Sequence, residues 1–175
     1  MKTNVRSFYN AFRDGVQDYN VIEFYMDEMK KAAEKDPIEF EYLINLFNEE
    51  EKDEENKLIL AEVLISLKWP PIKEKLHEFI DKSDYLSGKI EAAECLIDIG
   101  DESAADYLIK LAEEAYKKND DDSLVSAVYT LLKLNNKKGT QLFLSLVDKY
   151  PILIKYFEER RMQGVIERVR ARANE

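Results

Sequence analysis

Carboxylates are the residues of this sequence whose number and spacing could do chemistry. Glu62 and Glu94 occupy equivalent positions in two similar segments, and two neighbouring carboxyl groups can divide the roles of general acid and general base. That chemistry also requires a raised pKa on one carboxyl group and a pocket for a substrate, and the surrounding residues indicate neither. We therefore expect a protein that is not an enzyme, and we assign no catalytic residue.

Other reactive groups are scarce. The chain has one histidine, His77, and one cysteine, Cys95, which excludes the usual His/Cys zinc sites and an internal disulfide framework. A Cys/His nucleophile pair also lacks a third group to orient it. The acidic runs around Asp53 and Asp121 lack the spacing and central glycine of an EF-hand, and capping of helix N-termini by Asp53 and by Asp121 or Asp122 explains them. We expect no metal and no cofactor.

The composition narrows the class of partner. Among 175 residues there are 36 acidic and 26 basic side chains, a formal net charge of -10, which disfavours nucleic acid and favours a basic protein. No apolar run is long enough to span a membrane, and the first 20 residues lack the apolar core of a signal peptide. We therefore expect no membrane association and a cytoplasmic location.

Elements that could position these residues are helices, because the chain has only 5 glycines and 4 prolines and its apolar residues recur with a period of 3.6. Asp36-Pro37 and Asp53 are start signals, Pro70-Pro71 breaks the chain, and Gly100 is a stop signal followed by Asp101 as the next cap. A last helix is expected from Ile152, with Gly164 as a kink or interruption.

The helices repeat. When Leu67, Ile99 and Leu134 are aligned, the other apolar residues fall into shared columns, which are Leu64, Leu96 and Leu131; Ile65, Ile97 and Leu132; Ala61, Ala93 and Val128; Leu76, Leu108 and Phe143; and Phe79, Leu111 and Leu146. One helix pair cannot bury its whole apolar surface alone, so these pairs are expected to stack on one another as a curved solenoid.

The segment 91–113, EAAECLIDIGDESAADYLIKLAE, resembles the HEAT-like repeat of phycobilisome lyases. The likeness is carried by paired alanines, a leucine, a Gly-Asp turn and a following alanine and leucine, namely Ala92, Ala93, Leu96, Gly100, Asp101, Ala105 and Leu108. It departs at Trp69-Pro70 and Asn135-Asn136, where the Gly-Asp turn is absent. The resemblance implies an all-α protein, a short right-handed α-solenoid of about four to five helix pairs. We expect one domain over 1–175, with capping helices in 1–50, clear repeats in 51–150 and a capping helix in 151–175.

The second helix of each pair usually lines the concave surface in HEAT-like arrays, and its non-core columns here are mainly acidic. These columns contain twelve positions, of which six hold a carboxylate and one holds a lysine, Lys133. They lie on one helical stripe and should form an acidic ladder that attracts a basic protein or is simply solvated. The predicted partner-binding residues are Glu55, Glu62, Glu91, Glu94, Asp98, Asp122 and Tyr129, with Trp69 added as an aromatic residue that packs over its turn or stands exposed.

These features predict a non-catalytic protein-binding module whose acidic concave face binds a basic partner. In size and charge the chain resembles bacterial immunity proteins, which implies an inhibitor that neutralises a toxin such as a nuclease. A scaffold or assembly subunit, and a lyase-like enzyme or small-ligand binder, are the alternatives. The arginines of 160–172 could bind RNA or an anionic surface, form ion pairs within their helix, or dock on an acidic surface of another copy.

Overall fold

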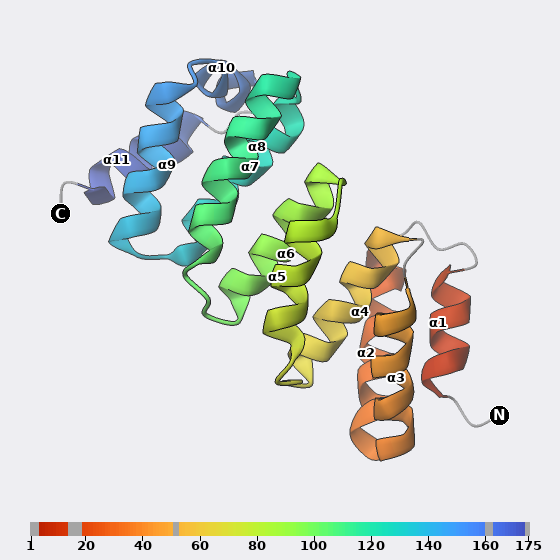
Figure 1. Cartoon of the computed structure of the whole chain (residues 1–175). Coiled ribbons are helices and arrows are strands. Elements are labelled where there is room, and N and C mark those ends of the chain that lie inside the picture. Colours follow the sequence, from red (N-terminus) through yellow and green to blue (C-terminus); the bar gives the residue numbers. More distant parts are fainter. Residues whose placement is uncertain (1–3, 14–18, 51–52, 160–162, 174–175) are drawn as a thin grey trace. The chain divides into compact units, whose positions relative to one another are not determined.

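The computed structural model describes residues 4–13, 19–50, 53–159 and 163–173 (Figure 1). Within these ranges every regular element is a helix, so the all-α prediction is confirmed. The chain divides into two compact units, residues 1–78 and 79–175. Each unit has its own core and is described by itself.

The first unit is built around α2 (Tyr19–Lys35), which packs against α1 (Val5–Arg13), α3 (Pro37–Glu49) and α4 (Glu54–Ser66). It also holds most of α5 (Ile72–Lys82). Met29, Leu43, Leu60 and Leu64 are completely buried in its core. The predicted caps are confirmed, because Asp36 accepts a hydrogen bond from the Ile38 N–H at 2.9 Å and Asp53 accepts one from the Asn56 N–H at 3.0 Å.

Two hydrogen bonds connect α1 to α3 and to Glu50, the C-cap residue of α3. The Val5 N–H donates to Glu39 Oε2 at 2.9 Å, and the hydroxyl of Tyr9, a ring that is only 4% exposed, donates to the Glu50 carboxylate. Burial of the hydroxyl is the main cause that raises the pKa of Tyr9 well above its ordinary value, and the hydrogen bond to Glu50 raises it further. Tyr9 is therefore a structural residue of the first unit.

Six α-helices follow α5 in the described part of the second unit. α7 packs against α6 and α8, while α6 contacts α8, α8 contacts α10, and α9 contacts α11. The bounds are α6 (Leu86–Asp98), α7 (Ala104–Lys118), α8 (Asp121–Thr130), the 3-10 helix η1 (Leu131–Leu134), α9 (Lys137–Lys149), α10 (Ile152–Glu159) and α11 (Gln163–Ala173).

Three of the five repeated apolar columns are core residues in both units, whereas Ile65, Phe79 and Leu132 in the other two columns are half-buried. Leu64, Leu96 and Leu131 are each 0% exposed, and so are their neighbours Ala61, Ala93 and Val128. Leu76, Leu108 and Phe143, in the helices that follow, are at most 1% exposed. The register that was read from the sequence therefore selects the buried face of each helix.

The residue after each aligned anchor adopts the left-handed backbone conformation. Lys68, Gly100 and Asn135 follow Leu67, Ile99 and Leu134, and their φ angles are 56°, 83° and 48°. The N–H groups of Trp69 and Asp101 then donate to Leu64 and Leu96 carbonyls at 3.0 and 2.8 Å, which satisfies carbonyls at the helix C-termini. Two of the three turns lack the Gly-Asp pair. Lys68 and Asn135 stand there in place of glycine, and they adopt the same left-handed conformation.

Two predicted helix starts are displaced. The residue before α7 is Ser103, and Asp101 stands two residues earlier, where its side chain accepts from the Ser103 N–H at 3.0 Å. The cap of α8 is Asp120, which accepts from the Ser123 N–H at 3.0 Å; Asp121 and Asp122 lie in the first turn of that helix. Near both helix starts, several neighbouring residues have side chains that can occupy the N-cap position. The residue types alone therefore do not show which of them does so.

The predicted interruption at Gly164 is also wrong. The segment after Ile152 holds two helices, α10 ending at Glu159 and α11 beginning at Gln163, so Gly164 lies inside the first turn of α11. Packing explains the pair, because α11 buries Ile166 and Val169 and contacts α9. The described residues therefore form two helices where one was expected, and Gly164 lies inside the second of them.

Candidate functional site

The second unit carries the larger part of the predicted partner-binding stripe. Glu91 and Asp98 are exposed on α6, and Asp122 and Tyr129 are exposed on α8, with the Tyr129 ring 41% accessible. Their inward neighbours Ala92, Leu96 and Val128 are completely buried, so the alternation along each helix separates core from surface. An exposed ring beside carboxylates is a surface that can contact a partner through both charge and apolar area.

Glu94 lies in the middle of this stripe and is engaged within the unit. Its carboxylate pairs with Lys133 in η1 and accepts a hydrogen bond from Thr130 Oγ1 at 3.4 Å. The hydrogen bond that Lys133 Nζ donates to the Glu94 carboxylate raises the pKa of Lys133. Lys133 is the one cation among the predicted ladder positions, so it offsets one carboxylate of the stripe and ties η1 to α6.

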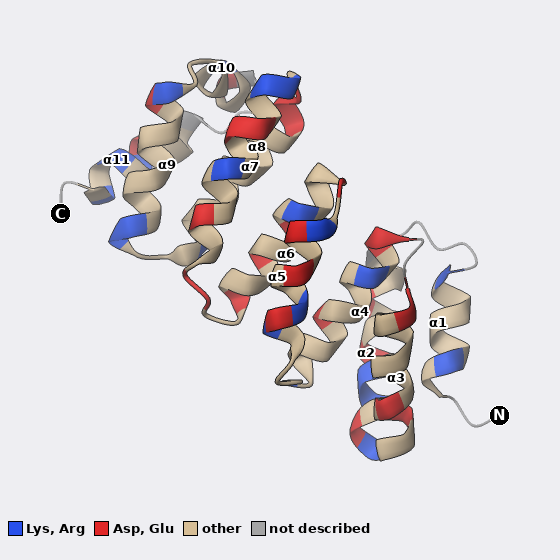
Figure 2. Cartoon of the chain, viewed as in Figure 1, with Lys and Arg blue, Asp and Glu red and all other residues tan. Residues whose placement is uncertain are grey.

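The stripe continues to the next helix through Asp122. Its Oδ1 accepts a hydrogen bond from the Tyr156 hydroxyl of α10 at 3.2 Å. We define the acidic stripe of the second unit as Glu91, Glu94, Asp98 and Asp122, with Lys133 and Tyr129 beside them. Four carboxylates and one lysine give this surface a formal charge of -3. Figure 2 shows the acidic positions over the helices of both units.

The remaining predicted residues belong to the first unit. Glu55 and Glu62 are exposed on α4. Trp69 does not stand fully exposed: it is half-buried, and its ring packs edge-on against the buried Phe47, with ring centroids 6.0 Å apart and an interplanar angle of 75°. Trp69 therefore packs over the turn after α4.

The described part of the chain offers no group of three or more His, Cys, Asp and Glu side chains that could hold a metal ion. Cys95 is buried in α6, with Ala92 and Leu96 buried on either side of it. None of the described helices has the length and apolar character needed to cross a membrane.

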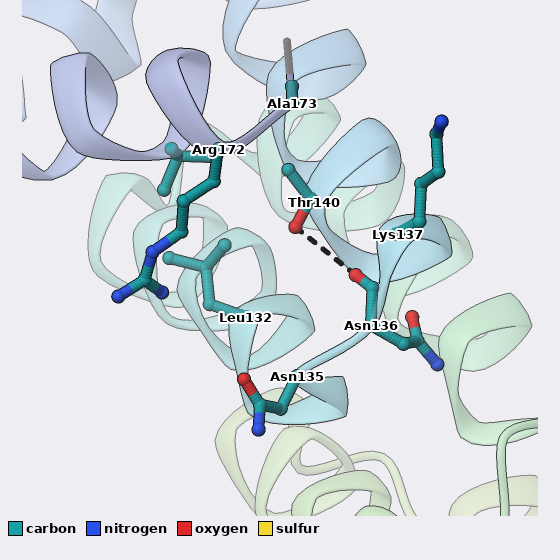
Figure 3. Close-up of a pocket in the computed structure, with 8 residues that line it drawn as sticks. Leu132, Asn135, Asn136, Lys137, Thr140, Arg172 and Ala173 are labelled. Atoms are coloured by element: carbon teal, nitrogen blue, oxygen red, sulfur yellow. Dashed lines mark hydrogen bonds between the residues drawn. The ribbon is translucent and has the colours of Figure 1, made fainter. Parts of the chain in front are cut away.

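A feature that the sequence did not predict is a pocket of about 280 Å³ in the second unit. It lies where η1, the turn before α9, and α11 meet, and it is lined by Leu132, Asn135, Asn136, Lys137, Thr140, Val169, Arg172 and Ala173. Figure 3 shows the Arg172 side chain running beside Leu132, with the Thr140 hydroxyl on the facing wall. Two sequence features could have indicated this pocket, namely the Asn135-Asn136 pair and the basic last turn of α11. They lie far apart in the sequence, so no local pattern joins them.

A second surface feature joins the ends of α7 and α9. The rings of Tyr116 and Tyr150 lie with centroids 4.5 Å apart, and Tyr116 is 50% exposed. Beside them Lys149 Nζ donates to Glu113 Oε1 at 2.6 Å, and this hydrogen bond lowers the pKa of Glu113. These contacts hold the two helices together at the surface.

No protein-family model matches the chain, and comparisons with curated proteins and with solved structures give no significant match.

Proposed function

We propose that the chain is a non-catalytic protein-binding module, and that the acidic stripe of the second unit binds a basic protein. The observation that carries the proposal is the exposure of Glu91, Asp98 and Asp122 on neighbouring helices, next to the exposed ring of Tyr129. Carboxylates held on rigid helices keep their spacing without a cost in loop ordering, and an exposed tyrosine supplies contact area at low conformational entropy.

The architecture that we propose for this role is a short right-handed HEAT-like solenoid. Its support is the contact of alternate helices in the second unit, α6 with α8, α8 with α10, and α9 with α11. The recurrence of left-handed residues at Lys68, Gly100 and Asn135 after equivalent helices also supports it. Stacked helix pairs of this kind present one row of helices as an extended binding surface.

Electrostatics favour a basic protein over other partners. A net charge of -10 repels nucleic acid at long range and accelerates the encounter with a cation-rich surface. The narrower form of the proposal is an inhibitor, such as an immunity protein, that works in the cytoplasm by covering the basic active site of a toxin. A scaffold that binds a basic partner without inhibiting it uses the same surface.

The test is affinity capture from the native cell extract with three forms of the chain. These are the wild type, a variant with Glu91→Lys and Asp98→Lys, and a control with Asp106→Lys, which changes an exposed carboxylate on α7 outside the stripe. We expect the wild type and the control to retain the same basic protein, which high salt releases, and the stripe variant to lose it. Equal capture by all three forms would overturn the assignment of the surface.

A second measurement separates inhibition from scaffolding. The captured protein is purified and its own activity, nuclease activity first, is measured with and without the chain. Loss of that activity on addition of wild-type chain, and its return with the stripe variant, support the inhibitor. Unchanged activity in a stable complex supports the scaffold.

A further inference from the structure

The pocket between η1, α9 and α11 is lined by both apolar and cationic residues. Leu132, Val169 and Ala173 supply the apolar side, and Arg172 and Lys137 supply the charge. The volume of about 280 Å³ is near the lower end of the range for small-molecule sites. A pocket with this lining suits a molecule that has an apolar body and one charged group.

The charge of this region has the opposite sign to the charge of the chain. Arg168 and Arg172 are four residues apart on α11, so they share one face of that helix, and Lys137 and Lys138 begin α9, which contacts α11. All four side chains are exposed or line the pocket. Figure 2 shows the basic positions at the start of α9 and along α11.

These four cations differ from the other cation of α11, Arg170. Arg170 pairs with Asp148 at 3.2 Å, whereas within the part of the chain that the structure describes no carboxylate pairs with the four. The carboxylate bound to a residue of the pocket is Glu102, which accepts from Asn136 Nδ2 at 3.1 Å. Figure 3 shows the Asn136 amide directed away from Arg172. Among the described residues, no hydrogen bond or ion pair therefore engages the Arg172 guanidinium.

We propose that this pocket binds a small organic anion, a molecule with one carboxylate or phosphate group attached to an apolar portion. The guanidinium of Arg172 takes the anionic group, and the apolar portion lies against Leu132 and Val169. Figure 3 shows Lys137 directed away from Arg172, so Lys137 adds positive charge to the region without contacting the same group. An arginine offers paired donors to either anion, and these charge-assisted hydrogen bonds are the stronger kind. The acidic remainder of the chain repels a polyanion such as nucleic acid, which favours a small ligand.

The experiment uses the full chain labelled with ¹⁵N and follows its amide resonances during titration with four probes. Octanoate and octyl phosphate carry the two anionic groups, octylamine carries a positive charge, and octanol carries none. We expect saturable shifts for the two anions, confined to residues 132–140 and 169–173, and no comparable shifts for the other two probes. Whichever anion binds more tightly identifies the head group. Equal responses to octanol or octylamine, or shifts that do not saturate, would overturn the proposal.

Variants separate this site from general attraction to arginine. Arg172→Gln and Lys137→Gln remove cations of the pocket, and Arg170→Gln is the matched control, because it removes the same charge from the same helix outside the pocket. We expect Arg172→Gln to weaken anion binding about fivefold or more, Lys137→Gln to weaken it less, and Arg170→Gln to leave it nearly unchanged. Equal weakening by the Arg170 and Arg172 variants, or binding of inorganic phosphate as tight as that of octyl phosphate, would overturn the proposal.

Discussion

Lys133 pairs with Glu94 although 39 positions separate them along the chain. The aligned register accounts for this contact, because Lys133 stands one residue and Glu94 five residues before equivalent anchors in neighbouring repeats. Such positions lie on the same stripe of helices that contact one another. The contact also reduces the charge of the stripe at its centre, so the stripe consists of exposed carboxylates on both sides of a neutralised pair.

Removal of this lysine should increase the affinity of the stripe for a basic molecule. Replacing Lys133 by Ala changes the formal charge of the stripe from -3 to -4, and we expect a hexalysine peptide to bind about two- to fivefold more tightly at low salt. Fluorescence anisotropy of the labelled peptide measures the change. Stability should fall by less than about 1 kcal/mol, because the pair is partly exposed.

Lys110→Ala is the control for that measurement. Lys110 is exposed on α7, outside the stripe, and its removal changes the net charge of the chain by the same amount. We expect it to alter peptide affinity much less than Lys133→Ala does. A similar gain from both variants would show that peptide binding follows the net charge and not the stripe.

The cap of α8 predicts a pH dependence of stability. Hydrogen bonds from Ser123 to the Asp120 carboxylate lower the pKa of Asp120. A carboxyl group whose pKa is lowered on folding contributes stability above its ordinary pKa, near about 4, and loses that contribution as the pH falls through the lowered value. Asp120→Ala should therefore cost about 1 kcal/mol at neutral pH, and the cost should shrink in acid.

Urea unfolding of the wild type and the variant between neutral and acidic pH measures this difference. Asp121→Ala is the matched change in the first turn of α8, where a carboxylate is stabilised by the helix dipole, and it should cost about 0.3 kcal/mol. If Asp121→Ala costs more than Asp120→Ala, the assignment of the cap is wrong.

How far the sequence predicts this structure depends on how local the deciding interaction is. The burial of Leu64, Leu96 and Leu131 follows from an apolar period that repeats, and that period is visible in the residues themselves. The choice of Asp120 over Asp121 depends on backbone angles at one residue, and the packing of Trp69 on Phe47 depends on a contact across 22 positions. The pocket depends on α11 reaching α9, which no local pattern encodes.

The left-handed turns give a prediction with opposite signs in the two units. Lys68 adopts a φ of 56° and Gly100 a φ of 83°, and a side chain in this region costs about 1–2 kcal/mol. Gly100→Ala should therefore destabilise the second unit by about 1 kcal/mol through its positive φ alone, because among the described residues nothing beyond the neighbours of Gly100 in the chain lies within 4 Å of an added Cβ.

Lys68→Gly should have the reverse effect in the first unit. It relieves the strain but adds freedom to the unfolded chain, so the net gain is at most about 1 kcal/mol. Thermal unfolding followed by circular dichroism measures both variants. A loss of stability with Lys68→Gly would mean that contacts of the lysine side chain outweigh its backbone strain.

Two glycines in helices of the second unit should also respond in opposite directions to alanine. A Cβ on Gly139 would lie 2.5 Å from the Leu131 carbonyl oxygen and 2.9 Å from Leu134 Cβ. The backbone of η1 must then move away from α9, and we expect a loss of about 1–3 kcal/mol despite the better helix propensity of alanine. Gly139 is therefore required by the close approach of two backbones.

Gly164 has no such constraint. Among the described residues, the atoms nearest to an added Cβ belong to the end of the flexible Arg168 side chain, with Nη1 at 3.1 Å, and this side chain can rotate away. Gly164→Ala should stabilise the protein by about 0.5–1 kcal/mol, because alanine loses less backbone freedom in a helix. Thermal unfolding of both variants checks the contrast. If Gly164 interrupted a helix, as its sequence context predicts, alanine would instead destabilise the chain, so the sign of this one change separates an interruption at Gly164 from a helix that passes through it.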